Sequence, residues 1–462
     1  SGTAFAGMSL DYMRFNSDGM LNNYKMERDA IRKYDKETPI TTNLMGTYKG
    51  LDYFKWAKEM DIVSWDNYPS YNTPWSHVAM THDLMRGLKD APFMLMEQTP
   101  SQQNWQPYNS LKKPGQMRAQ SYQTVAHGAD TIQFFQLRRS VGGCEKFHGA
   151  VIAHAGTADT RVFCEVTQLG KELEKIGSRV MGSENHAKVG IIFDWENYWA
   201  LEYTSGPNRD LRYVDQIEQM YNYFYNKNIA VDMIPIDADF SKYDLVAAPV
   251  LYMVKDGVAE SLEAYVQAGG TLITTYMSGI VGQSDNVHLG GYPGPLRKMA
   301  GVWVEEIDAL APEQRNKIRF ADGTEEECRL VCDLMHLEGA EEIAQYESDF
   351  YAGMTAVAKN QFGKGTVYYV GTELSESGLA KVLAMAADGA AIQPVIGEAT
   401  ALEITKRQAD GEDLYFIINF KDEEIPLPAV FDGKEDILTG EKVQGGEMLK
   451  KYDLQIVSVP RA

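Results

Sequence analysis

Cysteine is scarce in this sequence, with four residues in a chain of 462. Four cysteines cannot cross-link so long a chain, so a disulfide framework is excluded and a reducing, cytoplasmic setting is expected. Cys328 and Cys332 lie four residues apart, but His336 is the sole nearby candidate for a further metal ligand. A structural role therefore suits these two thiols better than a metal site, and no cofactor is expected.

The sequence also lacks an excess of basic residues and long apolar runs. Its formal net charge of -21 at pH 7 argues against nucleic acid or an anionic membrane as a partner, and it suits a neutral substrate. No apolar run approaches the roughly 20 residues that a membrane span needs, and no signal peptide is visible. A chain of this length is expected to fold as two or three domains.

Among the features that are present, the stretch Phe93–Glu97 is the most informative. Four apolar residues follow Pro92 and predict a strand buried on both faces, as in a parallel sheet. The run ends at Glu97, which places a carboxylate at the carboxyl end of the strand. In a parallel α/β barrel that end is the catalytic face, so the acid indicates chemistry. A carboxylate there can also cap the strand or pair with an arginine, and the strand alone leaves that alternative open.

Predicted strands and helices alternate through the first 185 residues, which is typical of a parallel sheet. The strands are Pro39–Gly46, Asp61–Pro69, Phe93–Glu97 and Thr131–Gln136, and the helices are Leu10–Tyr34, Leu51–Met60, Trp75–Leu88, Gly115–His127 and Val166–Val180. Every strand ends in polar or aromatic residues, namely Asn43, Asp66, Asn67, Tyr68, Glu97, Gln98, Gln136 and Arg138. Four such ends on one face of a sheet predict a shared site.

The strand and helix pattern restarts after residue 185 and predicts a doubly wound α/β domain over residues 186–395, similar to flavodoxin or glutaminase folds. Its predicted strands are Lys188–Phe193, Ala230–Pro235, Leu245–Pro249, Thr271–Tyr276 and Val367–Val370, and its helices are Asp210–Asn228, Val258–Ala268 and Leu379–Ala387. The domain has no phosphate-binding loop, and no cysteine follows Leu245–Tyr252, where a glutaminase-like domain would carry its nucleophile. We therefore expect it to be non-catalytic. In residues 396–462, short strands of period two separated by Asp-Gly turns predict a small antiparallel β domain.

A series of ordered motifs in the first domain is specific enough to indicate a family. The motifs are Thr41–Gly46, Lys49–Tyr53, Val63–Pro69, Met96–Ser101, Asn104–Pro107, Gly128–Asp130, Phe134–Arg138 and Glu145–Gly149. Together they resemble family 42 glycoside hydrolases, the microbial β-galactosidases. The resemblance implies that Glu97 closes the seventh strand of the barrel and is the nucleophile, with Tyr68 beside it. It also implies that Glu145 and His148 bind galactose hydroxyls and that Phe135 lines the pocket.

The chemistry of the reaction agrees with a carboxylate at position 97. A retaining glycosidase uses one ionised carboxylate to attack the anomeric carbon and one protonated carboxyl to release the leaving group. Trp105, eight residues beyond Glu97, would form an apolar wall for the sugar, because the C–H face of a pyranose packs on an aromatic ring.

The acid/base glutamate of the family belongs to an Asn-Glu pair at the end of the fourth barrel strand, and this sequence has no counterpart. Glu196-Asn197 lies in the second domain and has the reverse order, while Glu27, Glu37 and Glu59 fall in or beside helices. The resemblance therefore predicts the C-terminal half, strands five to eight, of a TIM (β/α)8 barrel. The four-cysteine zinc cluster of some relatives would lie in the other half, so no metal is expected here.

The sequence thus predicts a retaining β-galactosidase with domains at 1–185, 186–395 and 396–462 and a galactosyl-Glu97 intermediate. We expect a β-galactoside as substrate, a homotrimer built on the middle domain, and the acid/base glutamate on a separate N-terminal barrel half. Without that half, the chain is expected to be inactive. Two alternatives stay open: a non-catalytic sugar-binding or assembly fragment of such an enzyme, and an amidotransferase-like or ligand-sensing protein that uses the middle domain.

Overall fold

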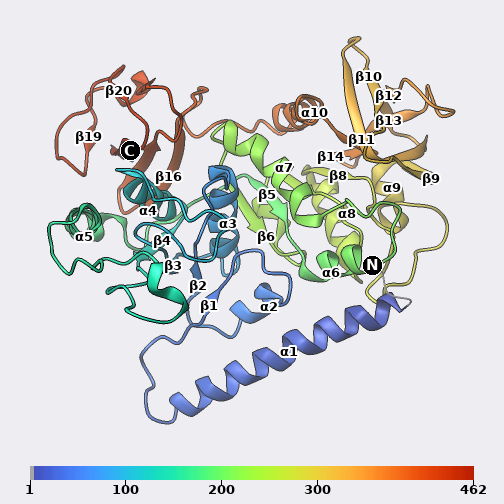
Figure 1. Ribbon diagram of the computed structural model, residues 1–462. Coiled ribbons are helices and arrows are strands. Elements are labelled where there is room, and N and C mark those ends of the chain that lie inside the picture. The colour runs from blue at the N-terminus through green and yellow to red at the C-terminus, as the bar shows by residue number, and fades with distance from the viewer. Residues whose placement is uncertain (1–4, 462) are drawn as a thin grey trace.

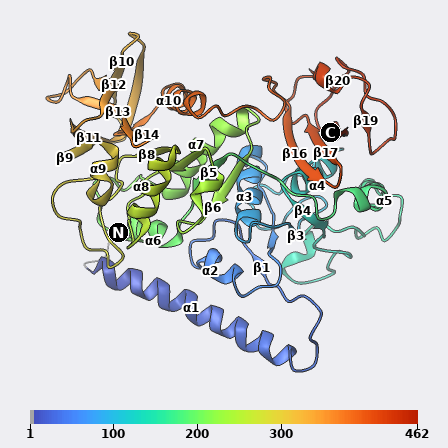
Figure 2. The ribbon, with the colours of Figure 1, turned by 180° about the vertical axis from the view of Figure 1, so that it is seen from behind.

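The computed structural model describes residues 5–461, whose helices and strands form three groups along the chain (Figure 1). A parallel sheet of four strands comes first, a large mixed sheet second and an antiparallel sheet last. The outermost ends of the first and third predicted domains, residues 1–4 and 462, lie outside the described part. Helix α1 (Ala6–Ile31) runs along one side of the molecule, at the bottom of both views (Figures 1 and 2).

The first sheet has its strands in chain order, and all of them are parallel. They are β1 (Asn43–Leu44), β2 (Ser64–Asp66), β3 (Phe93–Glu97) and β4 (Ala129–Ile132). The accompanying helices are α2 (Tyr53–Ala57), α3 (Trp75–Gly87), α4 (Gln116–Ala126) and α5 (Arg161–Val180), and a 3-10 turn, η1, spans Cys144–Phe147. The side chains of Asp52 and Thr160 begin α2 and α5 by accepting backbone hydrogen bonds from Lys55 and Phe163. The predicted alternation of strands and helices is confirmed.

Strand β3 has the predicted bounds but not the predicted burial. Phe93 and Leu95 are fully buried, while Met94 and Met96 are only half-buried. The prediction of burial on both faces was therefore wrong, because the alternation is that of a sheet covered fully on one face only. This leaves the side of β3 that carries Met94 and Met96 partly open.

Strand β4 lies earlier in the chain than the predicted Thr131–Gln136. It ends at Ile132, and beyond that point the chain makes only separate backbone hydrogen bonds, including one from Phe135 to Gln98. Residues 133–136 therefore form a loop at the carboxyl edge of the sheet rather than more of the strand.

The second group contains the predicted parallel strands, in the order β14-β8-β7-β5-β6. Their bounds are β5 (Val189–Ile192), β6 (Val231–Ile234), β7 (Leu245–Ala248), β8 (Thr271–Thr275) and β14 (Gly365–Val370). The helices and 3-10 turns are α6 (Trp195–Tyr203), α7 (Tyr213–Asn226), η2 (Phe240–Lys242), α8 (Val258–Ala268), η3 (Gly294–Leu296), α9 (Arg297–Ala300) and α10 (Glu376–Gly389).

The same sheet continues into antiparallel strands that the sequence analysis did not assign. They are β9 (Val302–Ala309), β10 (Asn316–Phe320), β11 (Glu325–Leu337), β12 (Glu341–Tyr346), β13 (Thr355–Phe362) and β15 (Thr372–Leu374). β13 pairs with β14 and so joins them to the parallel strands. The description as a purely doubly wound domain was therefore wrong, because eleven strands form one mixed sheet.

The C-terminal group is antiparallel, as predicted. Strands β16 (Glu403–Ala409), β17 (Glu412–Ile418), β21 (Leu454–Pro460) and β19 (Glu435–Asp436) form one sheet, β18 (Ile425–Pro426) pairs with β20 (Met448–Leu449), and a 3-10 turn, η4, spans Ala429–Phe431. The turn between β16 and β17 contains Gly411 at φ 74°, a conformation that glycine adopts without steric cost.

A buried charge network joins the three groups. Arg86 of α3 bonds Asp232 of β6 at 2.9 Å and also pairs with Asp83. The ring of His127, at the end of α4, lies 2.8 Å from Asp83 Oδ1 and 3.3 Å from Glu403 Oε1 of β16. Burial lowers the pKa of His127, but the two carboxylates outweigh it and raise the pKa to about 9. The network fixes α3 and α4, which flank the strand that ends at the proposed nucleophile.

The two cysteines of β11 are buried and carry free thiols, and Cys332 Sγ lies 3.6 Å from Thr372 Oγ1.

Over residues 5–461, no helix is both long enough and apolar enough to cross a bilayer.

Candidate active site

Three neighbouring strand ends of the first sheet bring polar side chains together. Asn43, on β1, donates from Nδ2 to Asp66 Oδ1 and Oδ2 at 2.9 and 3.1 Å and lies 3.2 Å from Glu97 Oε1. Asp66 is the direct pairing partner of Glu97 across β2 and β3, because the register shifts between Trp65 and Asp66. One amide group therefore contacts both carboxylates.

Glu97 is held through its second oxygen as well. The Tyr68 hydroxyl donates to Glu97 Oε2 at 2.8 Å. Burial, the hydrogen bond to Glu97 and its negative charge together raise the pKa of Tyr68 well above its usual value. Tyr68 thus stays a neutral donor, and both oxygens of Glu97 have fixed partners. A carboxylate held in this way is oriented for attack on an electrophilic carbon.

Asp66 is a second carboxyl group at the site, and the sequence analysis gave it no role. Burial is the largest cause that raises its pKa; the hydrogen bond from Asn43 lowers the pKa and the Glu97 charge raises it, to about 7 in total. The polar strand end at 66–68 was visible in the sequence. Its position level with Glu97 depends on the register shift, which the sequence does not display.

Aromatic rings form a wall beside the carboxylates. Trp105 stacks on His148 with ring centroids 5.2 Å apart and an interplanar angle of 21°, and Tyr68 meets Trp105 edge-on at 4.9 Å. Phe135 meets His148 edge-on at 5.2 Å. Trp105 is 52% exposed while His148 is fully buried, so the tryptophan presents one ring face to solvent. Four of the six predicted site residues therefore form one cluster: Tyr68, Trp105, Phe135 and His148. The hydrogen bond from Tyr68 connects this cluster to Glu97.

His148 and Glu145 have surroundings that the sequence did not reveal. His148 Nδ1 lies 3.2 Å from Asn104 Oδ1 and Nε2 lies 3.2 Å from the Phe135 carbonyl oxygen. Burial lowers the pKa of His148. Both ring nitrogens therefore have protein partners, and a direct contact with a sugar requires one of these to be exchanged. Glu145, in the turn η1, is half-buried and is close enough for its charge to contribute to the raised pKa of Tyr68.

Contacts with Lys112 and Gly149 hold the loop that follows β3 in place. The buried Lys112 donates to the Thr99 carbonyl at 2.5 Å, and burial lowers the pKa of this amine to about 7. A Cβ at Gly149 would lie 2.6 Å from Thr99 Oγ1, so only glycine allows the two loops to approach so closely. This packing holds residues 99–105, and with them Trp105, against the end of the strand.

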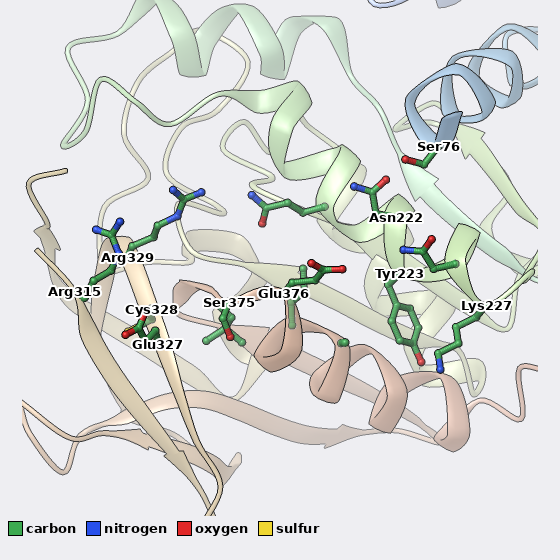
Figure 3. Close-up of a pocket in the computed structure, with 15 residues that line it drawn as sticks. Ser76, Asn222, Tyr223, Lys227, Arg315, Glu327, Cys328, Arg329, Ser375 and Glu376 are labelled. Carbon is green, nitrogen blue, oxygen red and sulfur yellow. The ribbon is translucent and has the colours of Figure 1, made fainter. Parts of the chain in front are cut away.

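In the part of the chain that the structure describes, no group of three or more His, Cys, Asp and Glu side chains is placed to hold a metal ion. A hollow of about 690 Å³ lies elsewhere, lined mainly by the mixed-sheet group and also by Ser76 of α3, and no predicted site residue lines it. Its charged lining residues include Arg315, just before β10, Arg329 of β11, Lys227 at the end of α7 and Glu376 at the start of α10 (Figure 3). Its charges are of both signs, so it indicates no ligand class.

Comparison with known proteins identifies the family. Residues 1–176 match the family model described as beta-galactosidase, residues 187–393 the beta-galactosidase trimerisation domain, and residues 401–458 the beta-galactosidase C-terminal domain. Beta-galactosidase LacZ of Lactobacillus acidophilus is 52% identical over 459 residues, which are 99% of this chain and 68% of that protein. The chain belongs to the family 42 β-galactosidases.

Other relatives of this family have similar coverage. Beta-galactosidase BgaA of a Planococcus species is 52% identical over 98% of this chain and 68% of its own length. The crystal structure of the β-galactosidase from Bacillus circulans sp. alkalophilus superimposes with a TM-score of 0.96 at 49% identity, covering 99% of this chain and 68% of that one. The chain therefore spans about two thirds of the length of these family 42 β-galactosidases.

Proposed function

We propose that this chain carries the nucleophile of a retaining β-galactosidase that hydrolyses terminal β-D-galactosides. The observation that carries the proposal is Glu97, held at a parallel strand end by Asn43 and Tyr68 beside the exposed ring of Trp105. Tyr68, Trp105, Phe135, Glu145 and His148 are proposed to form the pocket for the terminal galactose. No cofactor is needed for this chemistry.

The reaction has two steps. The ionised Glu97 carboxylate attacks the anomeric carbon, and the bond from that carbon to the leaving-group oxygen breaks as a general acid protonates the oxygen. Water then attacks the galactosyl-Glu97 ester and gives a proton to the same group, which now acts as a base, releasing galactose and the free carboxylate.

The general acid is proposed to be the glutamate of an Asn-Glu pair on an N-terminal half of the barrel, to which strands β1 to β4 add the second half. Asp66 is poorly placed for this role, since it shares the Asn43 amide with Glu97 and pairs directly with Glu97 across β2 and β3. The four parallel strands in chain order support a half barrel. The same proposal includes domain boundaries at residues 185 and 395, a homotrimer built through residues 187–393, and a cytoplasmic location.

Covalent trapping tests the nucleophile without needing the acid. In 2,4-dinitrophenyl 2-deoxy-2-fluoro-β-D-galactoside the leaving group departs unprotonated, and the fluorine slows hydrolysis of the ester, so the chain by itself should accumulate a label. Peptide mass spectrometry should place the label on Glu97, and the exposed control Glu37→Gln should label like the parent. Label on another residue would remove Glu97 from the mechanism.

Ordinary nitrophenyl β-galactosides test the missing acid. The chain alone should turn them over at least about 10²-fold more slowly than the chain assembled with the N-terminal third of the Lactobacillus acidophilus relative. Equal turnover would show that an acid within residues 1–462 suffices. A non-catalytic fragment would bind sugar but gain no turnover on assembly.

The proposed homotrimer is tested separately. Light scattering at micromolar concentration should give the mass of three chains.

A further inference from the structure

Two loops at the candidate site pair their aromatic residues twice. The loop after β2 carries Tyr68 and Tyr71, and the loop after β3 carries Trp105 and Tyr108, each pair three residues apart. Tyr68 meets Trp105 edge-on at 4.9 Å, and Tyr71 meets Tyr108 edge-on at 5.9 Å with an interplanar angle of 90°. We call Tyr71 and Tyr108 the outer pair. It repeats, one step further along both loops, the arrangement that lines the proposed galactose pocket.

Hydrogen bonds fix the two loops relative to each other. Gln103 Nε2 donates to the Pro69 carbonyl at 2.8 Å and joins them directly. Within the first loop, Ser70 N donates to Thr73 Oγ1 at 2.9 Å. Within the second, the Asn109 side chain accepts from Gln106 N and donates to Gln106 O, both at 3.1 Å. The outer pair therefore sits on ordered turns, so that little conformational freedom is lost when a ligand binds.

The outer pair is open to solvent. Tyr71 is 62% and Tyr108 69% exposed, compared with 52% for Trp105 and none for His148 beneath it. Exposure thus rises from the buried histidine through the pocket wall to the outer pair. Large exposed aromatic rings gathered on rigid loops are typical of a binding surface.

We infer that Tyr71 and Tyr108 form a platform for the sugar on the leaving-group side of the bond that Glu97 attacks; this inference rests on the proposed function. A terminal galactoside has no further unit on its non-reducing side, so the rest of the substrate extends out of the pocket toward solvent. The outer pair continues the same two loops beyond Tyr68 and Trp105 and is more exposed than Trp105, and tyrosine rings offer apolar faces for the C–H groups of a pyranose and hydroxyls for its polar edge. The site thus favours a galactoside of a neutral hexose over galactose alone.

The platform is tested by measuring sugar binding to a variant that cannot hydrolyse the sugar. In the Glu97→Gln background, isothermal titration calorimetry should be run with galactose and with β-1,4-galactobiose. Tyr71→Ala and Tyr108→Ala should each weaken galactobiose binding about fivefold to tenfold and leave galactose binding unchanged. Tyr108→Phe should retain most of the affinity because it keeps the ring, and Tyr34→Ala, at a 92% exposed tyrosine, is the matched control.

The outcomes separate the platform from the proposed function. If galactobiose binds the alanine variants as tightly as the parent, the platform is refuted while the galactose pocket stands. If the alanine variants weaken both sugars equally, the outer pair belongs to the pocket itself and the inference fails. If neither sugar binds the parent, the proposed function fails and the platform with it. A change of oligomeric state in Tyr71→Ala, seen by light scattering, would instead make the outer pair a contact between copies and overturn the inference.

Discussion

Two pairs of neighbouring parallel strands, β2 with β3 and β5 with β7, differ in the side chains at their carboxyl ends. Those at the first pair are partly open to solvent, and those at the second pair are buried. At the first pair, Asp66 and Glu97 are half-buried beside an exposed tryptophan. At the second pair, Asp194 is buried, begins α6 and lies 3.0 Å from Lys255 Nζ. The carbonyl of Val250, just after β7, accepts from Asn197 Nδ2 at 2.9 Å. At the second pair, the polar groups are therefore bonded to one another and are not open to a ligand.

The difference teaches that strand topology marks where a site can form but does not make one. Strands β5 and β7 flank the point where the strand order reverses, which is where doubly wound domains usually bind ligands. Here that crevice is filled by α6 and by an ion pair from α1, in which Arg14 bonds Glu196 at 2.9 and 3.1 Å. The proposed function is assigned to the sheet whose carboxyl groups have partners that orient them and still face solvent.

The largest expected effect comes from neutralising one carboxylate in each sheet. Glu97→Gln should slow labelling by the dinitrophenyl fluorogalactoside by more than about 10³-fold and leave the melting temperature unchanged, because it removes only the attacking group. Asp194→Asn should leave labelling unchanged and cost about 3 kcal/mol of unfolding free energy, since it leaves Lys255 with less compensation in a buried site. Thermal melts and labelling rates measure both. Loss of labelling in Asp194→Asn with the fold intact would contradict the assignment of chemistry to the first sheet and of a structural role to Asp194.

The next effect concerns the network that fixes α3 and α4. The pKa of His127 is raised from 6.5 to about 9 in the folded state, so its charge stabilises the fold fully below about pH 6.5, and this contribution is lost as the pH rises through 9. His127→Gln should therefore cost about 3 kcal/mol at pH 6 and little at pH 10. Urea titrations of both proteins across this range check it. A cost that grows with pH would mean that His127 is neutral in the fold.

The alternation of strands and helices in the first group could be predicted from the sequence, and β3 most closely, because it is an apolar run that ends at a carboxylate. Phe93–Glu97 was predicted to the residue, and the C-terminal strands β16, β17, β18 and β21 were recognised by their period of two, whereas β19 and β20 were not. The strands between residues 302 and 362 were not recognised. The burial of β10 alternates residue by residue, so a signal of period two was present there as well.

The site was predicted by resemblance more fully than by pattern. The residues around Trp105 and His148 come together from separate loops, and no local periodicity links them. The pairing of Asp66 with Glu97 and the Asn43 bridge depend on an irregular register between β2 and β3. Such irregularities arise from packing across the sheet and leave no mark in a single strand.

A tyrosine that is hydrogen-bonded to a carboxyl group occurs in both sheets and allows a finer comparison. Tyr68→Phe should slow labelling at saturating reagent about tenfold, with half-saturation unchanged, since it removes the charge-assisted hydrogen bond that orients Glu97. Tyr369→Phe removes a 2.7 Å bond to the buried Asp333 in the mixed sheet, a carboxyl group whose pKa burial raises to about 8, and should affect only stability. Equal labelling rates in Tyr68→Phe and the parent would show that Asn43 alone orients the nucleophile.

The smallest effect tests how firmly α1 closes the crevice of the mixed sheet. Arg14 bonds both oxygens of Glu196, but their side chains are 27% and 21% exposed, so water screens the pair. A double-mutant cycle with Arg14→Ala and Glu196→Ala should therefore give a coupling energy of about 0.5–1 kcal/mol that falls in 1 M salt. The more exposed pair Lys58–Asp237, at 3.5 Å, should give a coupling near zero under the same conditions. A coupling above about 2 kcal/mol would mean that the ion pair, rather than the apolar face of α1 around Leu10 and Leu21, holds this helix on the molecule.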